Sequence, residues 1–165
     1  HKLIYYRKVV YLAKKYSPNA KSIIDIGSFH TPYLHRFGWI PEKVSLDKRP
    51  GNLKGVRVIQ ADFIKWKPDK VYDVVLCLQV LEHLENPRHF VQKLLKCGHF
   101  IIISVPYLWT SSMYHRHIHD PIDEKKLQKW IGRPWDEAVI VKEKNGVERL
   151  IVVLKNPKDK SNISN

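Results

Sequence analysis

Four apolar runs in this sequence end at residue types that can bind ligands or move protons. They end at Asp25 with Gly27, at Asp47, at Asp62, and at the Leu-Glu-His segment of residues 81–83. If these runs are parallel strands, the polar groups meet at the carboxyl edge of one sheet, which is where open α/β sheets bind ligands. Asp47 follows Gly27 by 20 positions, about the spacing between the glycine turn and the ribose-binding acid of nucleotide-binding folds. The pattern predicts a site for a nucleoside-containing cofactor.

Glu82 and His83 end the fourth run and are predicted to face a substrate. Because an unperturbed imidazole has a pKa near 6.5, His83 is suited to take a proton from an oxygen or nitrogen group at neutral pH. The competing interpretation is that His83 packs on the sheet edge or caps the next helix.

A loop rich in aromatic, basic and hydroxyl side chains follows the fifth apolar run, at residues 107–120. Loops that follow strands often carry binding residues, and this composition suits a polar acceptor such as a sugar or an anionic metabolite. Tyr107, Arg116 and His119 are the residues of this loop that we expect to bind the acceptor, together with Glu82.

The histidines of this loop raise the question of a metal. His115, His117 and His119 alternate along the chain and are followed by Asp120, and alternating histidines in a loop can bind zinc. No matching set of ligands stands elsewhere in the sequence, so we predict a site without a metal. A structural role for His119 and Asp120 near the start of a helix is the competing interpretation.

The segments that would position these groups alternate between strand and helix patterns. Apolar runs predict strands at residues 21–26, 43–46, 57–60, 72–78 and 99–105. Helical spacing and caps predict a helix over the sheet edge at 1–16 and further helices at 32–37, 87–96 and 122–131. Residues 138–143 and 147–154 flank Asn145-Gly146, which predicts an antiparallel hairpin.

Local stop and start residues set the limits of these elements. Thr31 and Asn86 are predicted to cap helices, because each precedes a proline at the first helical position. Gly98 is predicted to end the helix that Asn86 starts. We expect one domain at residues 1–155, with a flexible tail at 156–165.

Composition limits the classes of protein further. The chain has 165 residues and a net charge of +13, from 29 basic and 16 acidic residues. This charge fits either a solvated surface or a polyanion partner such as nucleic acid. Cys77 and Cys97 are predicted to be buried free thiols, which suits a reducing, cytoplasmic setting. No apolar run approaches the roughly 20 residues that span a bilayer, and the sequence indicates no oligomeric state.

The order of elements and four motifs resemble the class I S-adenosylmethionine-dependent methyltransferases. The resemblance covers residues 20–154, and its motifs are Ile24–Ser28, Leu46-Asp47, Gln60–Phe63 and Asp73–Leu84. The last motif is the most specific, because its Val-Leu-Glu-His segment is similar to that of small bacterial-type methyltransferase domains. The resemblance implies an α/β fold: a Rossmann-like three-layer sandwich with a mostly parallel seven-stranded sheet that ends in an antiparallel hairpin.

The resemblance also implies a cofactor, S-adenosylmethionine, with S-adenosylhomocysteine as product. The resemblance implies which residues contact each part of this cofactor. The methionine part would be contacted by Asp25, Gly27, Ser28 and Phe29, and the ribose by Asp47, with Lys48 beside it. The adenine would be contacted by Asp62 and Phe63, and Leu78 and Gln79 would also line the cofactor site. Phe29 and His30 stand where the family has small residues.

We therefore predict an enzyme that moves a methyl group to an oxygen or nitrogen of a small polar acceptor, with His83 as the catalytic residue. One alternative is a nucleic-acid (RNA) methyltransferase or binding module, suggested by the charge and the five tryptophans. A second is a degenerate, non-catalytic member that acts as a binding protein, suggested by Phe29 and His30. A nicotinamide dehydrogenase is disfavoured, because the sequence lacks G-x-G-x-x-G and has no room for a second substrate domain.

Overall fold

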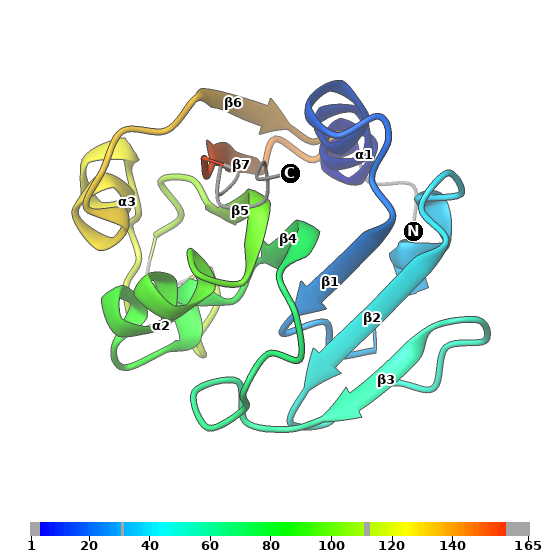
Figure 1. Ribbon diagram of the computed structural model, residues 1–165. Coiled ribbons are helices and arrows are strands. Elements are labelled where there is room, and N and C mark those ends of the chain that lie inside the picture. Colours follow the sequence, from blue (N-terminus) through cyan, green and yellow to red (C-terminus); the bar gives the residue numbers. More distant parts are fainter. Residues whose placement is uncertain (1–3, 31, 111–112, 158–165) are drawn as a thin grey trace.

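The sheet has the topology that the sequence predicts. The computed structural model describes residues 4–30, 32–110 and 113–157, and in them seven strands form one sheet in the order β3-β2-β1-β4-β5-β7-β6 (Figure 1). The strands are β1 (Ser22–Ile26), β2 (Glu42–Asp47), β3 (Arg57–Gln60), β4 (Tyr72–Leu78), β5 (Gly98–Pro106), β6 (Glu137–Lys142) and β7 (Glu148–Lys155). The first five pair in parallel, and β7 is antiparallel to both β5 and β6. The predicted Rossmann-like α/β sandwich is confirmed.

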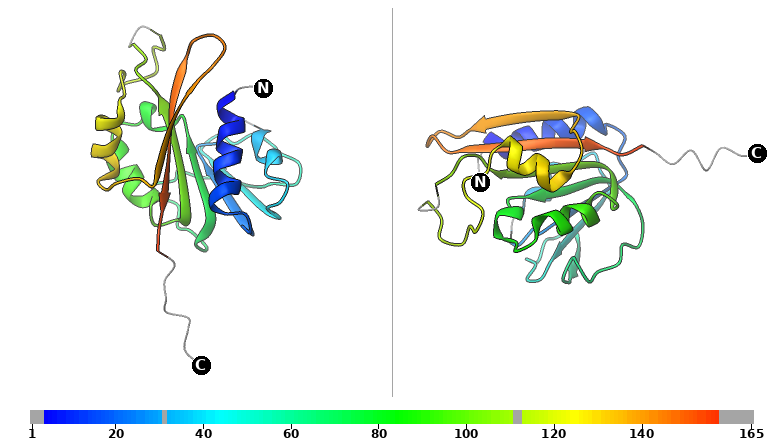
Figure 2. Two further views of the ribbon diagram at one scale, coloured as in Figure 1. Left: turned by 90° about the horizontal axis from the view of Figure 1, so that it is seen from above. Right: turned by 90° about the vertical axis from the view of Figure 1, so that its left-hand side faces the viewer.

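Helices cover both faces of this sheet. They are α1 (Ile4–Tyr16), α2 (Pro87–Leu94) and α3 (Glu124–Ile131), with 3-10 turns η1 (Pro32–Arg36) and η2 (Leu81–His83). Seen along the sheet, α1 lies on one side and α2 and α3 lie on the other (Figure 2). Within the described ranges no helix follows β2 or β3, as the turn residues there predict.

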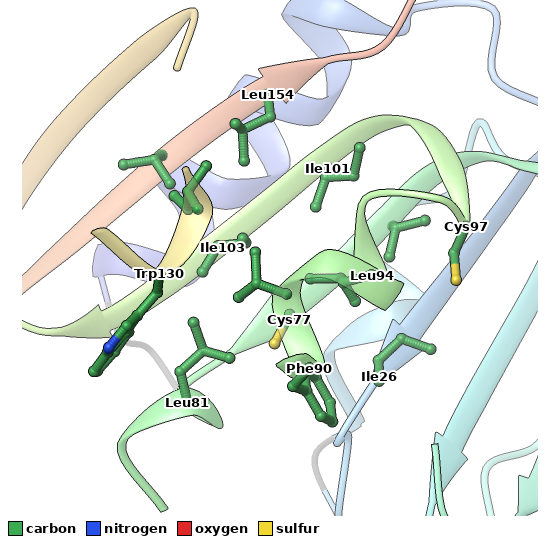
Figure 3. Close-up of a cluster of buried hydrophobic side chains, with 14 of the residues drawn as sticks. Ile26, Cys77, Leu81, Phe90, Leu94, Cys97, Ile101, Ile103, Trp130 and Leu154 are labelled. Atoms are coloured by element: carbon green, nitrogen blue, oxygen red, sulfur yellow. The ribbon is translucent and has the colours of Figure 1, made fainter. Parts of the chain in front are cut away.

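Successive side chains of the central strands point to opposite faces of the sheet, and this produces two hydrophobic cores, one on each face. Ile101 and Ile103 of β5 pack with α2 and α3, whereas Ile102 between them packs on the α1 side. Figure 3 shows the first core, in which Phe90 and Leu94 of α2 and the other helical side chains lie against the sheet. Because successive side chains of a strand point to opposite faces, a continuous apolar run is what a strand covered on both faces requires.

Caps define where the helices begin. The side chain of Asn86 accepts a hydrogen bond from the backbone N–H of His89 at 3.0 Å, as predicted. Asp123 does the same for the N–H of Lys126 at 2.8 Å, so α3 begins at Glu124 instead of Ile122. At the start of α1, the carboxylate of Glu143 accepts the backbone N–H groups of Ile4 and Tyr5. Residues 1–3 of the predicted first helix and the predicted cap Thr31 lie outside the described residues.

Two sequence predictions are corrected. Gly98 does not end the helix: it is the first residue of β5, and a Cβ there would lie 2.4 Å from Cγ2 of Val75, so glycine is needed for β5 to lie against β4. Asn156 does not belong to a tail: its backbone N–H donates to the His99 carbonyl at 2.8 Å and its side-chain N–H to the Gly98 carbonyl at 2.9 Å. The remaining tail prediction, from residue 158 on, lies outside the described residues.

The two thiols agree with the sequence prediction, whereas α2 ends at Leu94, two residues before its predicted end. Cys77 and Cys97 are buried and free, as predicted. In residues 4–30, 32–110 and 113–157, no helix has both the length and the apolar character needed to cross a membrane.

Candidate active site

The ends of three neighbouring strands hold unusual backbone conformations. In the described chain, the non-glycine residues with positive φ are Phe29 after β1 (48°), Gln79 after β4 (57°) and Leu108 after β5 (55°). Because β1, β4 and β5 pair in parallel, their ends lie at one edge of the sheet, the edge toward which β1, β2 and β3 point in Figure 1. Such conformations are disfavoured for side-chain-bearing residues and cluster at functional sites, so this edge is the candidate site.

Gly27 forms the turn after β1 under close constraint. Its φ is +80°, and its N–H donates to the Leu46 carbonyl of β2 at 2.8 Å. A Cβ at this position would lie 2.5 Å from Cγ2 of Val80, in the segment after β4. Glycine is required here both by conformation and by space.

Asp47 ties the end of β2 to this turn. Its Oδ2 accepts the backbone N–H of Phe29 at 2.9 Å, and its Oδ1 accepts the N–H of Arg49 at 2.7 Å. Each carboxylate oxygen has more than one acceptor position, so Asp47 can still receive ribose hydroxyl groups.

Asp25 is a buried acid with an unused oxygen. It is 1% exposed, and its Oδ2 has no hydrogen-bond partner among the described residues. Burial raises the pKa of Asp25 to about 7. The nearby Tyr33 hydroxyl, which makes no hydrogen bond of ordinary geometry within the described residues, lowers this pKa, and the negative charge of Asp47 raises it further. An orphaned buried carboxylate is costly and is suited to meet a cationic group.

Asp62 and Lys48 face each other across the ends of β2 and β3. Lys48 Nζ lies 3.1 Å from Asp62 Oδ2, and Asp62 Oδ1 accepts the N–H of Ile64 at 2.9 Å. The hydrogen bond from Lys48 holds the pKa of Asp62 below its ordinary value. Asp62 therefore caps the turn that follows β3, and Lys48 holds its carboxylate at the edge of the sheet.

The remaining predicted cofactor residues divide between open and packed positions. Phe29 is 52% exposed, whereas Phe63 and Leu78 are buried in the cores. The Ser28 hydroxyl is buried and hydrogen-bonded to that of Ser45 at 2.6 Å, which turns it toward β2. Gln79 is fixed beside β5, because its amide donates to the Ser104 hydroxyl at 3.1 Å.

A second polar cluster, formed by η2 and the loop after β5, contains Glu82, His83 and His117. One ligand-type atom from each lies within 4.8 Å of the others. His83 Nδ1 lies 3.1 Å from the Arg116 carbonyl, and His117 Nδ1 lies 2.7 Å from Oδ2 of Asp120. Burial raises the pKa of Glu82 to about 8 and lowers the pKa of His83.

The three loop residues that are predicted to bind the acceptor lie in three different environments. The Tyr107 hydroxyl donates to the Glu124 carboxylate at the start of α3, at 3.0 Å. His119 Nε2 lies 2.6 Å from the Leu84 carbonyl, which is the structural role considered from the sequence. Arg116 meets His83 through its backbone carbonyl, and its side chain is exposed. Residues 111 and 112 of the same loop lie outside the described residues.

Sequence reasoning did not single out Trp109 or Arg149. The Trp109 ring stacks on His117, with ring centroids 5.5 Å apart. The Arg149 guanidinium lies 5.6 Å from the centre of the Trp109 ring and 3.6 Å from the Glu143 carboxylate. Arg149 comes from β7, far along the chain, so no local pattern could have linked it to this cluster.

Comparisons with known proteins agree with this geometry. Residues 38–99 match the family model described as methyltransferase domain. Ubiquinone biosynthesis O-methyltransferase of Rickettsia conorii is 43% identical over 44 residues, which are 26% of this chain and 15% of that protein. The same enzyme of Rickettsia felis is 45% identical over 47 residues, 27% of this chain and 18% of that protein. The matched segment thus spans less than a fifth of either relative.

Solved structures match over almost the whole chain. N-methyltransferase NodS from Bradyrhizobium japonicum WM9, in complex with S-adenosylhomocysteine, has a TM-score of 0.76 at 12% identity and covers 93% of this chain and 86% of its own. The 1,6-didemethyltoxoflavin-N1-methyltransferase of Burkholderia thailandensis has a TM-score of 0.78 at 10% identity, and the match covers 94% of this chain and 79% of that enzyme.

The chain therefore has the fold of the class I S-adenosylmethionine-dependent methyltransferases, and the resemblance predicted from the sequence is confirmed. The match to the methyltransferase-domain model and the neighbours crystallised with S-adenosylhomocysteine support the predicted enzyme class and cofactor.

Proposed function

We propose that this chain is a methyltransferase that uses S-adenosylmethionine to methylate an oxygen or nitrogen of a small polar acceptor. The observation that carries the proposal is the arrangement at the carboxyl edge of the sheet. There the constrained turn at Gly27 lies beside the end of β2, where Asp47 holds the loop, and the buried carboxylate of Asp25 precedes the turn with an unused oxygen.

Each part of the cofactor has a partner of suitable chemistry in this arrangement. Asp25 would meet the ammonium group of the methionine part, because a cation compensates a buried carboxylate whose Oδ2 has no hydrogen-bond partner among the described residues. Asp47 would accept the ribose hydroxyl protons, and Asp62 at the rim would accept a proton of the adenine amine. The backbone of Gly27, Phe29 and Gln79 would lie against the sulfonium part.

Methyl transfer demands alignment more than covalent help from the protein. The acceptor atom attacks the methyl carbon in line with the bond to sulfur, so the chain must hold the cofactor and acceptor in one geometry. The group of Glu82, His83 and His117 lies on the expected acceptor side, since η2 begins three residues after β4 ends. An imidazole there can take the acceptor proton, or it can help to hold a cation that lowers the pKa of the acceptor group so that its proton is lost to solvent.

Direct assay of transfer tests the proposal. The protein would be incubated with methyl-labelled S-adenosylmethionine and a panel of hydroxylated sugars, phenolic compounds and anionic metabolites, with Asp47→Ala as the control variant. Label in an acceptor with the wild type, and much less with the variant, supports the proposal. A wild type that binds the cofactor but labels no acceptor would favour the non-catalytic binding protein.

One surface favours nucleic acid as a second candidate partner. A shallow groove on the outer side of α1 and η1 is lined by Arg7, Tyr11, Lys14, Arg36 and Trp39, among others. Lys14 Nζ lies 4.8 Å from the centre of the Trp39 ring. Cations interleaved with aromatic rings suit phosphates and bases. Binding of single-stranded RNA that weakens steeply with salt would support this candidate, and absence of binding at low salt would remove it.

A further inference from the structure

We propose that Glu82, His83 and His117 form a binding site for a divalent cation such as zinc. Glu82 and His83 come from η2, and His117 comes from the loop between β5 and α3. The fold brings the three side chains together, with one oxygen or nitrogen of each within 4.8 Å of the others.

The hydrogen bonds of the two imidazoles determine which nitrogen is free. His83 Nδ1 lies 3.1 Å from a backbone carbonyl, which can only accept, so this nitrogen carries the hydrogen. His117 Nδ1 lies 2.7 Å from the Asp120 carboxylate, so it also donates. Each ring therefore presents the lone pair of its Nε2. For His83, this nitrogen lies 4.0 Å from Oε1 of Glu82.

Glu82 supplies the second, independent observation. Its side chain is 1% exposed, and among the described residues neither of its carboxylate oxygens has a hydrogen-bond partner. The positive charge of Arg149 acts on Glu82, but the Arg149 guanidinium lies against the Glu143 carboxylate and the Trp109 ring. A buried carboxylate without a partner is strongly unfavourable, and a cation held by Glu82 and the two imidazoles removes that cost.

The surroundings of the three groups are those of a metal site. Metal-binding histidines commonly donate their other ring N–H to a carboxylate or a carbonyl, which fixes the tautomer and the ring orientation. Asp120 does this for His117, and the Arg116 carbonyl does it for His83. The Trp109 ring, stacked on His117, adds an apolar wall.

The donor set selects the kind of cation. Two imidazoles and one carboxylate are a known set for catalytic zinc and for other first-row metals with open positions. Tetrahedral ligands at about 2.1 Å from a zinc ion lie about 3.4 Å from one another. The three groups, now within 4.8 Å of one another, must therefore close by up to about 1.4 Å when the ion binds, a movement that needs rotation of the side chains.

A cation at this cluster would replace the metal-free site that the sequence predicts. The sequence shows three alternating histidines with no ligand set near them, and only one of the three, His117, lies in the cluster. His119 Nε2 instead lies against the Leu84 carbonyl, and His115 is exposed. The missing ligands, Glu82 and His83, precede the loop by a whole strand and helix.

A cation at this site also limits the chemical class of the acceptor, an inference that rests on the proposed methyl transfer. Val80, which follows β4 and precedes η2, packs against Gly27 of the candidate cofactor turn. A hydroxyl oxygen in an open coordination position would lose its proton to solvent. That oxygen would form the bond to the methyl carbon, and the electron pair of the broken carbon–sulfur bond would stay on sulfur. The class of acceptor is therefore a compound with an ionisable hydroxyl group.

Calorimetric titration of chelator-treated protein with Zn²⁺ tests the site. We expect the wild type to bind one ion, and Glu82→Gln and His117→Gln to bind it at least about 100-fold more weakly, since second-shell changes alone cost about 10- to 100-fold. His115→Gln is the matched control, because it removes an exposed histidine of the same loop and should bind like the wild type. Equal binding by all four proteins, or no binding by the wild type, would overturn the proposal.

Two further measurements keep the result clear. If Glu82→Gln or His117→Gln fails to fold by circular dichroism, Asp120→Asn replaces it, with an expected loss of about 10- to 100-fold; unchanged affinity in that variant overturns the site. S-adenosylhomocysteine is titrated into the same proteins. If the wild type binds the cofactor product but not zinc, the cation site is overturned and the proposed function stands. If it binds zinc but not the cofactor product, the proposed function is overturned and the cation site stands.

Discussion

The carboxylate of Asp47, at the end of β2, accepts the backbone N–H of Phe29, in the turn after β1, at 2.9 Å. Phe29 has a φ of 48°, which is unfavourable for a residue with a side chain. The hydrogen bond therefore holds a strained loop in place, so Asp47, for which we propose a ribose-binding role, also shapes the candidate cofactor turn.

Asp47→Ala should weaken S-adenosylhomocysteine binding by about 1–3 kcal/mol, because it leaves loop N–H groups and ribose hydroxyls without an acceptor. The measurement is the ratio of calorimetric Kd values. Asp47→Asn, which keeps one acceptor oxygen, should lie between the two proteins. A Kd unchanged in Asp47→Ala would refute the role.

Gly27→Ala should destabilise the protein through both conformation and space. The matched control is Gly55→Ala, because Gly55 has a similar φ of +73° but nothing within 4 Å of an added Cβ, whereas at Gly27 that Cβ meets Val80 at 2.5 Å. Urea unfolding should show a further loss of about 1–3 kcal/mol at Gly27 relative to Gly55. Adding Val80→Ala should recover part of this difference. Equal losses at the two glycines would mean that the close approach is unimportant.

The titration of Asp25 predicts a pH dependence with a definite sign. Its pKa in the folded protein is raised from 3.8 to about 7, so the folded state binds the extra proton between these values and the free energy of unfolding falls as pH rises from about 4 to about 7. A cationic ammonium group favours the ionised acid, so cofactor binding should tighten over pH 6 to 8, by at most about tenfold per unit.

Asp25→Asn separates this effect from other titrating groups. The variant should bind S-adenosylhomocysteine more weakly at pH 8 and should lose the part of the pH dependence that is due to Asp25. Parallel Kd profiles for wild type and variant between pH 6 and 8 would show that Asp25 does not meet the ammonium group.

His83→Ala should lower turnover much more than it weakens cofactor binding, because His83 lies in η2, where we propose that the acceptor binds, and not at the turn of Gly27. Chelation distinguishes its two possible roles. If His83 is a cation ligand, chelator treatment of the wild type should abolish turnover and zinc should restore it. If turnover survives chelation, His83 acts as a base without a metal, as the sequence alone predicts.

The sequence predicts the fold well where local patterns decide it. The strand at 57–60 and the strand at 72–78 have the predicted limits, because each is an apolar run bounded by turn residues. The hairpin around Asn145-Gly146 forms as predicted, with Gly146 at a φ of 84°. The prediction for Gly98 is wrong because a glycine after a helix is normally a stop, and only the approach of β4 to β5 reveals its other role.

The candidate site is predicted less completely, because its decisive features are long-range. That Glu82 is buried without a partner, and that His117 is oriented by Asp120, depends on how the loop after β5 folds onto η2. The sequence shows these residue types but not that they meet. Likewise, the N–H of Phe29 as partner of Asp47 depends on the pairing of β1 with β2.

Calorimetric titration of the folded protein with S-adenosylhomocysteine shows whether the carboxyl edge of this sheet binds the methyl donor and its product. We predict binding of one molecule with a Kd in the micromolar range. No binding up to millimolar concentration, by a protein shown to be folded, would contradict the proposed function and would favour a degenerate member that acts as a binding protein.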